Sequence, residues 1–336
     1  GSITKVVTAL TVMDLVEDGV LSLDDTVREH VPVEMGDAPP VTLEQLLSHS
    51  SGLDDQHAIQ PPDLEDRDEA VRLAMTGHRA FVPGENWRYS NAGFVVLAAV
   101  IEHATGNRYE EEARRRVLLP AGMEGSGFLD GLDAFGEPLD PERFTSRDLS
   151  GPRGWGADHL GLLDDGYGWG LRGAGGLLTS ARDLLRLDEA TTANRMVEAE
   201  TAAQMEALSS AYNGLGWFVG ETTWGGRLIS HGGSTRGYAA EFRRYTDEGA
   251  AVVVMTNMNM HQGARGIADG IESAMFTDLR PTVSVEMRLG GLQLNMYQVA
   301  SVEGPSLSVL RVDGGVRICA ASEGIVVMET LLNRQA

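Results

Sequence analysis

The sequence predicts an α+β protein in which an antiparallel sheet is flanked by helices and joined by a mostly helical second lobe. Apolar residues recur at helical spacing over 6–16 and fill the run 92–101, so we expect both segments to be buried helices. Short strand-like runs cluster over 214–256 and 305–330, and we expect them to form the sheet. Helices and strands that are segregated along a chain in this way are typical of α+β folds.

The first half of the chain supplies helices and loops. The first helix is expected to end at Gly19, because glycine readily takes the left-handed conformation of a helix cap. Residues 41–47 predict a short helix that begins at Thr42. Residues 54–68 are rich in Asp, Glu, Gln and Pro and predict an exposed acidic loop. Residues 122–165 are rich in Gly, Asp and Pro and predict a long surface loop that influences substrate choice.

The second half of the chain supplies the strands. Four strand-like runs lie at residues 214–219, 227–230, 238–245 and 250–256. The tail, residues 305–336, predicts two strands around the turn Asp313-Gly314-Gly315, followed by a connector.

The composition is that of one large globular domain, with 336 residues, 42% of them hydrophobic and 23% charged. A formal net charge of -22 argues against nucleic acid and anionic membrane as partners, because both require a basic face. No run of about 18 apolar residues is present, so no membrane span is expected. No signal peptide is visible at residue 1, which slightly favours the cytoplasm without fixing the compartment.

No cofactor and no metal ion are expected. The acidic stretch 54–68 has one histidine, His57, and no cysteine, and these do not complete a metal-ligand set. The glycines at 173–176 are not followed by a lysine at the spacing of a phosphate-binding loop, so we expect no nucleotide site. Cys319 is the only cysteine, so an intrachain disulfide is impossible.

Ser2 and Lys5 lie three residues apart at the start of the first helix, so their side chains share one face. A serine needs a base to become a nucleophile. A lysine can be that base where desolvation and nearby charge lower its pKa toward the working pH. The alternative is a helix-capping serine followed by a lysine on a solvated face.

Tyr89 and Asn91 lie two residues apart in a bend, directly before the buried helix at 92–101. Both side chains can therefore point into one cleft, the phenol as a proton carrier and the amide as a fixed donor and acceptor. The alternative is a turn with an asparagine cap. His49 is a lone histidine, and we expect it to be a hydrogen-bonded core residue outside the site.

These motifs resemble those of the serine β-lactamase and penicillin-binding-protein-like superfamily, most closely its class C β-lactamase and family VIII carboxylesterase branch. The resemblance is carried by residues 1–27 and 46–53, by Tyr89-Ser90-Asn91, and by His231-Gly232-Gly233-Ser234. It implies a β-lactamase/transpeptidase-like fold in a single catalytic domain. The helical lobe would span about 20–165, and the other lobe would combine 1–19, 166–280 and 305–336.

The resemblance also implies roles for the first two motifs. Ser2 would attack a carbonyl carbon, and Lys5 and Tyr89 would move the protons. Asn91 would hold the substrate amide or the Lys5 amine.

The third motif departs from the lactamase form, because His231 and Gly232 replace a lysine and a threonine. Gly233 would let the backbone approach the substrate, and the backbone N–H of Ser234 would form an oxyanion hole with that of Ser2. Arg236 is a candidate contact for a substrate carboxylate, with an exposed arginine at a strand end as the alternative.

The tail resembles the segment that precedes the nucleophile in this superfamily, a hairpin with Asp-Gly at its turn and then a connector. Joined tail to head, residues 329–336 would run on into Gly1-Ser2 and restore the family's order. We therefore expect a circularly permuted chain, or a chain cut just before the nucleophile, with 281–304 as the joint between the original termini. The alternative is that 281–336 form an unrelated small β appendage.

The function expected from these motifs is a serine hydrolase that forms an acyl-enzyme and cleaves esters or D-amino-acid amide and peptide bonds. Its partner would be a small-molecule or peptide acyl substrate. A β-lactamase or an acyl-transferring enzyme is one alternative, and a non-catalytic binding module of the same fold is another. Loss of the lysine and threonine that hold a lactam carboxylate favours esters and D-amides over β-lactams.

Overall fold

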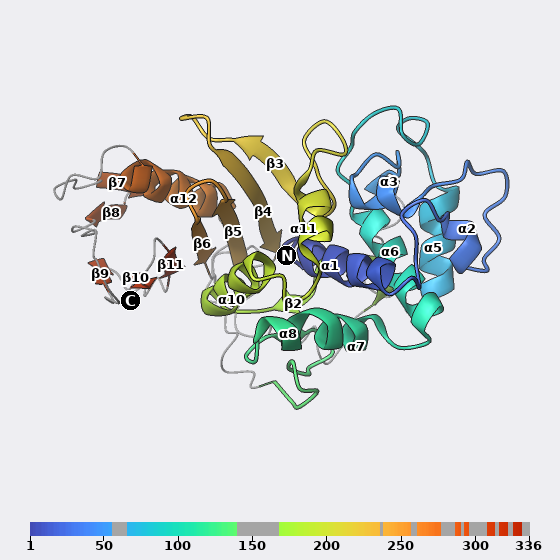
Figure 1. Cartoon of the computed structure of the whole chain (residues 1–336), viewed down its shortest axis with the longest axis horizontal. Helices are drawn as coiled ribbons and strands as arrows, with labels where there is room; N and C mark the ends of the chain where they lie inside the picture. The colour runs from blue at the N-terminus through green and yellow to red at the C-terminus, as the bar shows by residue number, and fades with distance from the viewer. Residues whose placement is uncertain are drawn as a thin grey trace.

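The computed structural model describes residues 1–55, 66–139, 168–235, 238–256 and 261–276, together with five strands between 286 and 330. A seven-stranded sheet makes up one lobe, and a group of helices packs beside it (Figure 1). Helix α1 (Thr4–Glu17) begins beside the sheet and runs into the helical lobe next to α6 (Asn91–Thr105). The expected α+β class is confirmed.

Helix α1 is the central helix of the molecule. Val6, Leu10 and Met13 are fully buried, and polar neighbours such as Thr8 are buried with them. A helix that is buried on all sides belongs to the interior of a large domain. The helix is followed by Gly19 with φ of 69°, the left-handed conformation that its sequence predicted.

The helical lobe is built from short helices around α6. Thr42 caps the short helix over 43–47 as expected, with its hydroxyl accepting the Gln45 N–H at 3.2 Å. Ser90 caps α6 in the same way, with Gly93 as the donor. The helices of this lobe are α2 (Val27–His30), α3 (Leu43–Leu47), α5 (Arg67–Thr76), α6, α7 (Tyr109–Ala113), the π-helical turn η1 (Arg114–Leu118) and α8 (Leu119–Ala121).

The sheet has the strand order β3-β4-β5-β6-β11-β10-β9. Its strands alternate between two faces, as period-two side chains require. On one face Phe242 and Val253 join the main core with α1 and α10, and on the other Val252 and Val254 pack against α12. The strands and helices are β3 (Phe218–Glu221), β4 (Arg227–Thr235), β5 (Tyr238–Tyr245), β6 (Ala250–Thr256), α10 (Ala181–Thr192), α11 (Ala199–Glu206), α12 (His261–Phe276) and the 3₁₀ turn η3 (Trp169–Leu171).

Two of the four predicted strands have the expected bounds, and two differ. β5 and β6 match the predicted runs. β3 begins only at Phe218, because residues 214–217 form a glycine turn in which Gly216 has φ of 80°. β4 continues past its predicted end at Ser230 to Thr235, so His231-Gly232-Gly233-Ser234 lies within a strand.

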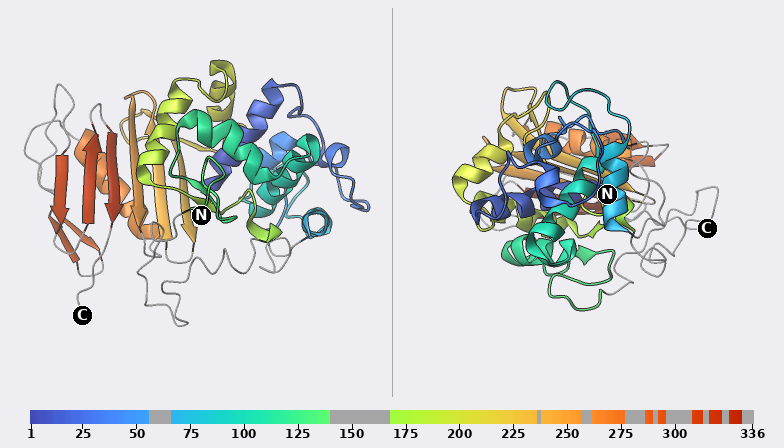
Figure 2. Two further views of the ribbon diagram at one scale, coloured as in Figure 1. Left: turned by 90° about the horizontal axis from the view of Figure 1, so that it is seen from below. Right: turned by 90° about the vertical axis from the view of Figure 1, so that its right-hand side faces the viewer.

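The tail forms three strands rather than two, and they extend the sheet from β6 (Figure 2). β9 (Ser308–Val312) and β10 (Val316–Ala321) pair antiparallel around the predicted turn. β11 (Ile325–Thr330) pairs with β10 but runs parallel to β6, so the wholly antiparallel sheet that we expected is wrong at this pair. Within 281–304, β7 (Glu286–Leu289) and β8 (Leu292–Asn295) form a separate hairpin. The circular permutation and its joint stay predictions.

Both predicted surface loops contain buried residues. In the stretch expected to be an exposed acidic loop, Asp54 is only 8% exposed, Asp55 is half-buried, and α5 begins at Arg67. In the stretch expected to be a surface excursion, β1 (Gly127–Phe128) pairs with β2 (Leu177–Leu178), and Phe128 is fully buried. Polar composition misled at these residues because specific partners elsewhere in the chain bury them. Residues 56–65 lie outside the described part of the chain. Residues 140–165 lie outside the described part of the chain.

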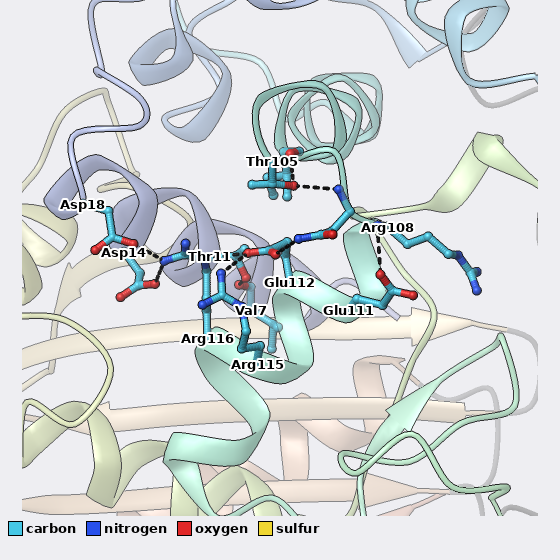
Figure 3. Close-up of polar contacts among 12 residues, drawn as sticks. Val7, Thr11, Asp14, Asp18, Thr105, Arg108, Glu111, Glu112, Arg115 and Arg116 are labelled. Carbon is cyan, nitrogen blue, oxygen red and sulfur yellow. Dashed lines mark hydrogen bonds and ion pairs between the residues drawn. The ribbon is translucent and has the colours of Figure 1, made fainter.

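An ionic network joins the end of α1 to the helices beside it (Figure 3). Arg116 in η1 pairs with Asp14 and with Asp18, the latter at 2.7 Å, and with Glu112 at 2.7 Å. Arg115 pairs with the same Glu112 from the solvent side. Within the described residues, no helix is long and apolar enough to cross a membrane.

Candidate active site

Ser2 lies at the start of α1, where the first turn is tight. The Lys5 N–H donates to the Ser2 carbonyl oxygen at 3.0 Å, and the Thr4 N–H donates to that of Gly1 at 3.1 Å. Ser2 is half-buried, whereas Lys5, one turn further on, is fully buried. On the helix face that these two residues share, Ser2 is therefore reachable from solvent, whereas Lys5 lies in the interior.

The Lys5 amine is held by two carbonyl oxygens. Nζ lies 2.6 Å from Asn91 Oδ1 and 2.9 Å from the Ala174 backbone oxygen, and it lies over the Tyr89 ring at 4.9 Å from the centroid. Burial lowers the pKa of Lys5 from 10.5 to about 7, and the charge of Asp55 opposes that shift. A neutral amine has two N–H groups and one lone pair. Both N–H groups have acceptors here, so the lone pair is left to take a proton.

Tyr89 lies against both the Lys5 amine and Ser2. Its phenol shares a hydrogen bond with the Ser2 side chain. Burial raises the pKa of Tyr89 above its ordinary value, the Ser2 hydrogen bond opposes the rise, and Asp55 adds to it. The phenol therefore stays protonated at neutral pH. It can pass a proton only by receiving one as it gives one away.

Three rings fix the position of Tyr89. His49 lies 4.5 Å from it, Phe218 stacks on it at 6.1 Å, and His231 lies 6.3 Å away, all measured between ring centroids. His49 is a buried residue whose Nδ1 accepts the Ser90 N–H at 3.1 Å. Burial, then Lys5 and His231, lower the pKa of His49 well below its ordinary value. As its sequence context predicted, His49 is a hydrogen-bonded core residue, and it supports the phenol.

Asn91 is oriented by a residue that the sequence did not reveal. Its Nδ2 donates to Asp55 Oδ2 at 2.9 Å, while its Oδ1 accepts from Lys5. Asp55 lies two residues after the Ser50-Ser51-Gly52-Leu53 segment, in the stretch that we expected to be exposed. No local pattern marks it, because its partners lie 35 to 37 positions further along the chain.

Beside Ser2, the outer edge of β4 is not paired with β3. β3 pairs with β4 only as far as Ser230, so residues 231–235 have β5 on one side and the start of α1 on the other. A methyl group added at Gly233 would lie 2.9 Å from the Ser2 nitrogen. A glycine at position 233 is therefore needed for the close contact between β4 and the start of α1.

The other third-motif residues lie along the same edge. His231 is buried, with its ring 5.1 Å from that of Phe218. Ser234 is exposed, and its backbone lies against Gly1. Arg236 lies outside the described residues. Ser2, Lys5, Tyr89, Asn91 and His231, which the sequence placed in one site, are thus brought together.

A glycine turn at 173–176 closes the site from the side of α10. Thr8 Oγ1 donates to the Gly173 oxygen at 2.6 Å, and the Leu177 N–H donates to Thr4 Oγ1 at 3.1 Å. Gly173 has φ of 77°, which favours glycine, and a side chain there would collide with α6. These contacts hold the Ala174 carbonyl against Lys5.

The count of lysines is a sequence signal that also points to Lys5. Lys5 is the only lysine in the chain, and the other 26 of the 27 Lys and Arg residues are arginines. An arginine stays protonated in proteins, whereas a buried lysine can lose its proton. The only lysine therefore occupies the buried position where a neutral amine could act as a base.

Comparison with known proteins decides the family. The family model described as Beta-lactamase matches residues 1–273. The chain belongs to the Beta-lactamase family. It is 31% identical over 260 residues to the esterase EstB of Burkholderia gladioli, an alignment that covers 65% of this chain and 64% of the esterase. It is 28% identical over 272 residues to a D-aminopeptidase of Cereibacter sphaeroides, covering 76% of this chain and 49% of the peptidase.

A solved structure has the same fold as this chain. A D-stereospecific amidohydrolase from Streptomyces sp. aligns with a TM-score of 0.63 and 24% identity, over 83% of this chain and 86% of that chain. The predicted β-lactamase/transpeptidase-like fold is therefore confirmed. The chain spans only about half to two thirds of the length of the curated relatives named above.

Proposed function

We propose that the chain is a serine hydrolase of the Beta-lactamase family that acts through an acyl-enzyme on Ser2. The observation that carries this proposal is the connected set of Ser2, Tyr89 and a fully buried Lys5 whose pKa lies at about 7. Ser2 Oγ attacks the substrate carbonyl carbon and forms a C–O bond. Its proton moves through the Tyr89 hydroxyl toward the lone pair of Lys5. The protonated Lys5 returns the proton to the leaving alcohol or amine as its bond to carbon breaks, and water then releases the acyl group.

The edge of β4 supports an oxyanion hole. The backbone nitrogen of Ser234 lies against the start of α1, because a methyl group added at Gly1 would lie 2.7 Å from it. The N–H groups of Ser234 and Ser2 would receive the developing negative charge, an interaction worth about 3 kcal/mol per donor.

Esters and D-amino-acid amides are the proposed substrates. The names of EstB and of the D-aminopeptidase support these two classes. The third motif supports them as well, because Gly232 has no hydroxyl and the His231 imidazole is buried against the Phe218 and Tyr89 rings. A β-lactamase, or an enzyme that transfers the acyl group to an amine, remains the second candidate because all three motif positions are filled.

The test compares the chain with its Ser2→Ala variant on three substrates: a short-chain p-nitrophenyl ester, a D-alanine p-nitroanilide and nitrocefin. We expect kcat/KM to be highest for the ester or the D-amide and about two to three decades lower for nitrocefin, since two hydrogen bonds to the lactam carboxylate are missing. Ser2→Ala should lose at least about 10³-fold on every substrate. The matched control is Ser22→Ala, on an exposed serine that follows α1 and has no contact with the site residues named above.

Two results would overturn parts of this proposal. Activity of Ser2→Ala close to that of the parent would remove Ser2 from the mechanism. Nitrocefin as the best substrate would replace the esterase or peptidase assignment with a lactamase. A non-catalytic binding module would give no covalent adduct with an acylating probe, so intact-protein mass after incubation with a fluorophosphonate separates that alternative.

A further inference from the structure

Asp55 makes four hydrogen bonds at the start of α6, and they fall into two groups. Oδ1 accepts the backbone N–H of Asn91 at 2.7 Å and of Ala92 at 3.0 Å, and the Ser90 hydroxyl at 3.2 Å. Oδ2 accepts the Asn91 side-chain Nδ2 at 2.9 Å. The first group stabilises the end of a helix, as any capping carboxylate would. The second has no part in capping.

The Nδ2 contact decides which way the Asn91 amide faces. An amide has a donor end and an acceptor end, and a carboxylate can only accept. Asp55 therefore requires Nδ2 on its own side, which leaves Oδ1 toward Lys5 at 2.6 Å. With the amide reversed, Oδ1 would face the Asp55 carboxylate, two acceptors with no proton between them, and Nδ2 could bond to the neutral Lys5 amine only by occupying its lone pair.

We propose that Asp55 is a positioning residue that acts on Lys5 through Asn91, holding the amide so that the Lys5 N–H groups are occupied and its lone pair faces the nucleophile. This role rests on the proposed function for its effect on catalysis. Its effect on the state of Lys5 does not require that function. Asp55 is outside every motif that identifies the family in this chain.

The charge of Asp55 predicts the direction in which the pKa of Lys5 changes when the carboxylate is removed. Burial lowers the pKa of Lys5, and the Asp55 carboxylate partly offsets that shift. Among the described residues, the other titratable groups that face Lys5 are Tyr89 and His49, and His231 lies beyond Tyr89. Removing the carboxylate while keeping these groups should lower the pKa of Lys5 below about 7.

The single lysine allows a direct measurement. Lysine labelled with ¹³C at Cε gives one side-chain signal from the whole chain, since Lys5 is the only lysine. Its chemical shift, followed against pH, reports the pKa of Lys5 without substrate. We expect a midpoint near 7 in the parent, a lower midpoint in Asp55→Asn, and a midpoint above that of the parent in the exchange variant Asp55→Asn with Asn91→Asp, where the carboxylate contacts the amine directly.

Two matched variants separate positioning from capping and from charge in general. Ser90→Ala removes the hydroxyl that caps α6 and contacts Asp55 but leaves the Asp55–Asn91 contact, so it should lower the unfolding temperature and leave the Lys5 midpoint unchanged. Asp54→Asn removes the neighbouring buried carboxylate, which pairs with Arg88 at 3.3 Å, and should also leave the midpoint unchanged.

The kinetic arm follows kcat/KM for the ester against pH. In Asp55→Asn the acidic limb should move to lower pH, and the plateau should fall about 10- to 100-fold, the loss expected for one hydrogen bond to a charged group. A Lys5 midpoint and an acidic limb equal to those of the parent, with a loss of stability like that of Ser90→Ala, would make Asp55 a helix cap alone. If the Lys5 midpoints shift as expected but no variant hydrolyses any substrate, the positioning holds and the proposed function fails.

Discussion

At the scale of single residues, Lys5 decides what this site can do. Its amine is fully buried, and it is held by the Asn91 and Ala174 carbonyl oxygens rather than by a carboxylate. Direct contact with a carboxylate would stabilise the ammonium form and raise the pKa. Two neutral acceptors satisfy the N–H groups and leave the amine basic near neutral pH. Asp55 lies on the far side of Asn91 from Lys5, and its charge offsets only part of the pKa decrease that burial causes.

The pH dependence of hydrolysis follows from this environment. A base acts in its neutral form, so kcat/KM should fall about tenfold per pH unit below a pKa of about 7 and level off above it. Lys5→Arg keeps a long cationic side chain that stays protonated, so we expect a loss of at least about 10³-fold and no limb near pH 7. The measurement is a kcat/KM profile from pH 5.5 to 9 on the p-nitrophenyl ester. A limb near pH 7 that survives in Lys5→Arg would assign it to another group.

Sequence reasoning found the residues with local signals and missed those without them. Helix periodicity placed Ser2 and Lys5 on one face, and Tyr89 and Asn91 precede a marked apolar run. Only the resemblance to a known superfamily selected these four as site residues. Asp55 and the Ala174 carbonyl were not predictable. Their roles depend on contacts between segments far apart in the chain, and a backbone carbonyl has no signature in the sequence.

At the scale of elements, the site depends on how closely α1 approaches β4. The bounds of β5 and β6 were predictable because both lie inside the sheet, where β6 is apolar on both faces and β5 buries most of its side chains, three charged ones included. The start of β3 and the parallel pairing of β11 with β6 were not predictable from period two, which gives the faces of a strand but not its neighbours. The contact between the start of α1 and β4 is marked in the sequence by two glycines, Gly1 and Gly233, at which an added methyl group would collide with the other backbone.

Gly233→Ala should therefore damage activity more than stability. The added methyl group would lie 2.9 Å from the Ser2 nitrogen and 3.2 Å from that of Ile3, so the start of α1 must move away from the strand. We expect kcat to fall about 100-fold, since small displacements of a nucleophile are costly, and stability to fall by about 1 to 3 kcal/mol.

The control for this change is Gly220→Ala, in β3 of the same sheet, where an added methyl group meets nothing within 4 Å. It should change kcat by less than about twofold. The two variants are compared by ester kinetics and by thermal unfolding. Equal kinetics for both would mean that the contact between Gly233 and the helix is not needed for catalysis.

At the scale of the whole molecule, α1 connects the two lobes. Its first turn meets the sheet, and its last turns are tied to η1 and α7 of the helical lobe by the Arg116 network (Figures 1 and 3). Arg116 is 9% exposed and Glu112 is 1% exposed, so each needs the other to offset its loss of water. The network thus fixes the far end of the helix that carries the nucleophile.

Arg116→Met should destabilise the protein, whereas Arg115→Met should barely affect it. Both arginines pair with Glu112 at 2.7 Å, but the side chain of Arg115 is 59% exposed and that of Arg116 only 8%. Removing the buried partner leaves Glu112, Asp14 and Asp18 as neighbouring negative charges, at a cost on the order of 3 kcal/mol, while an exposed pair contributes about 0.5 kcal/mol. In thermal unfolding we expect a fall of about 6 °C for Arg116→Met and about 1 °C for Arg115→Met. Equal, small shifts for the two variants would show that the apolar packing of α1 holds the lobes together without this network.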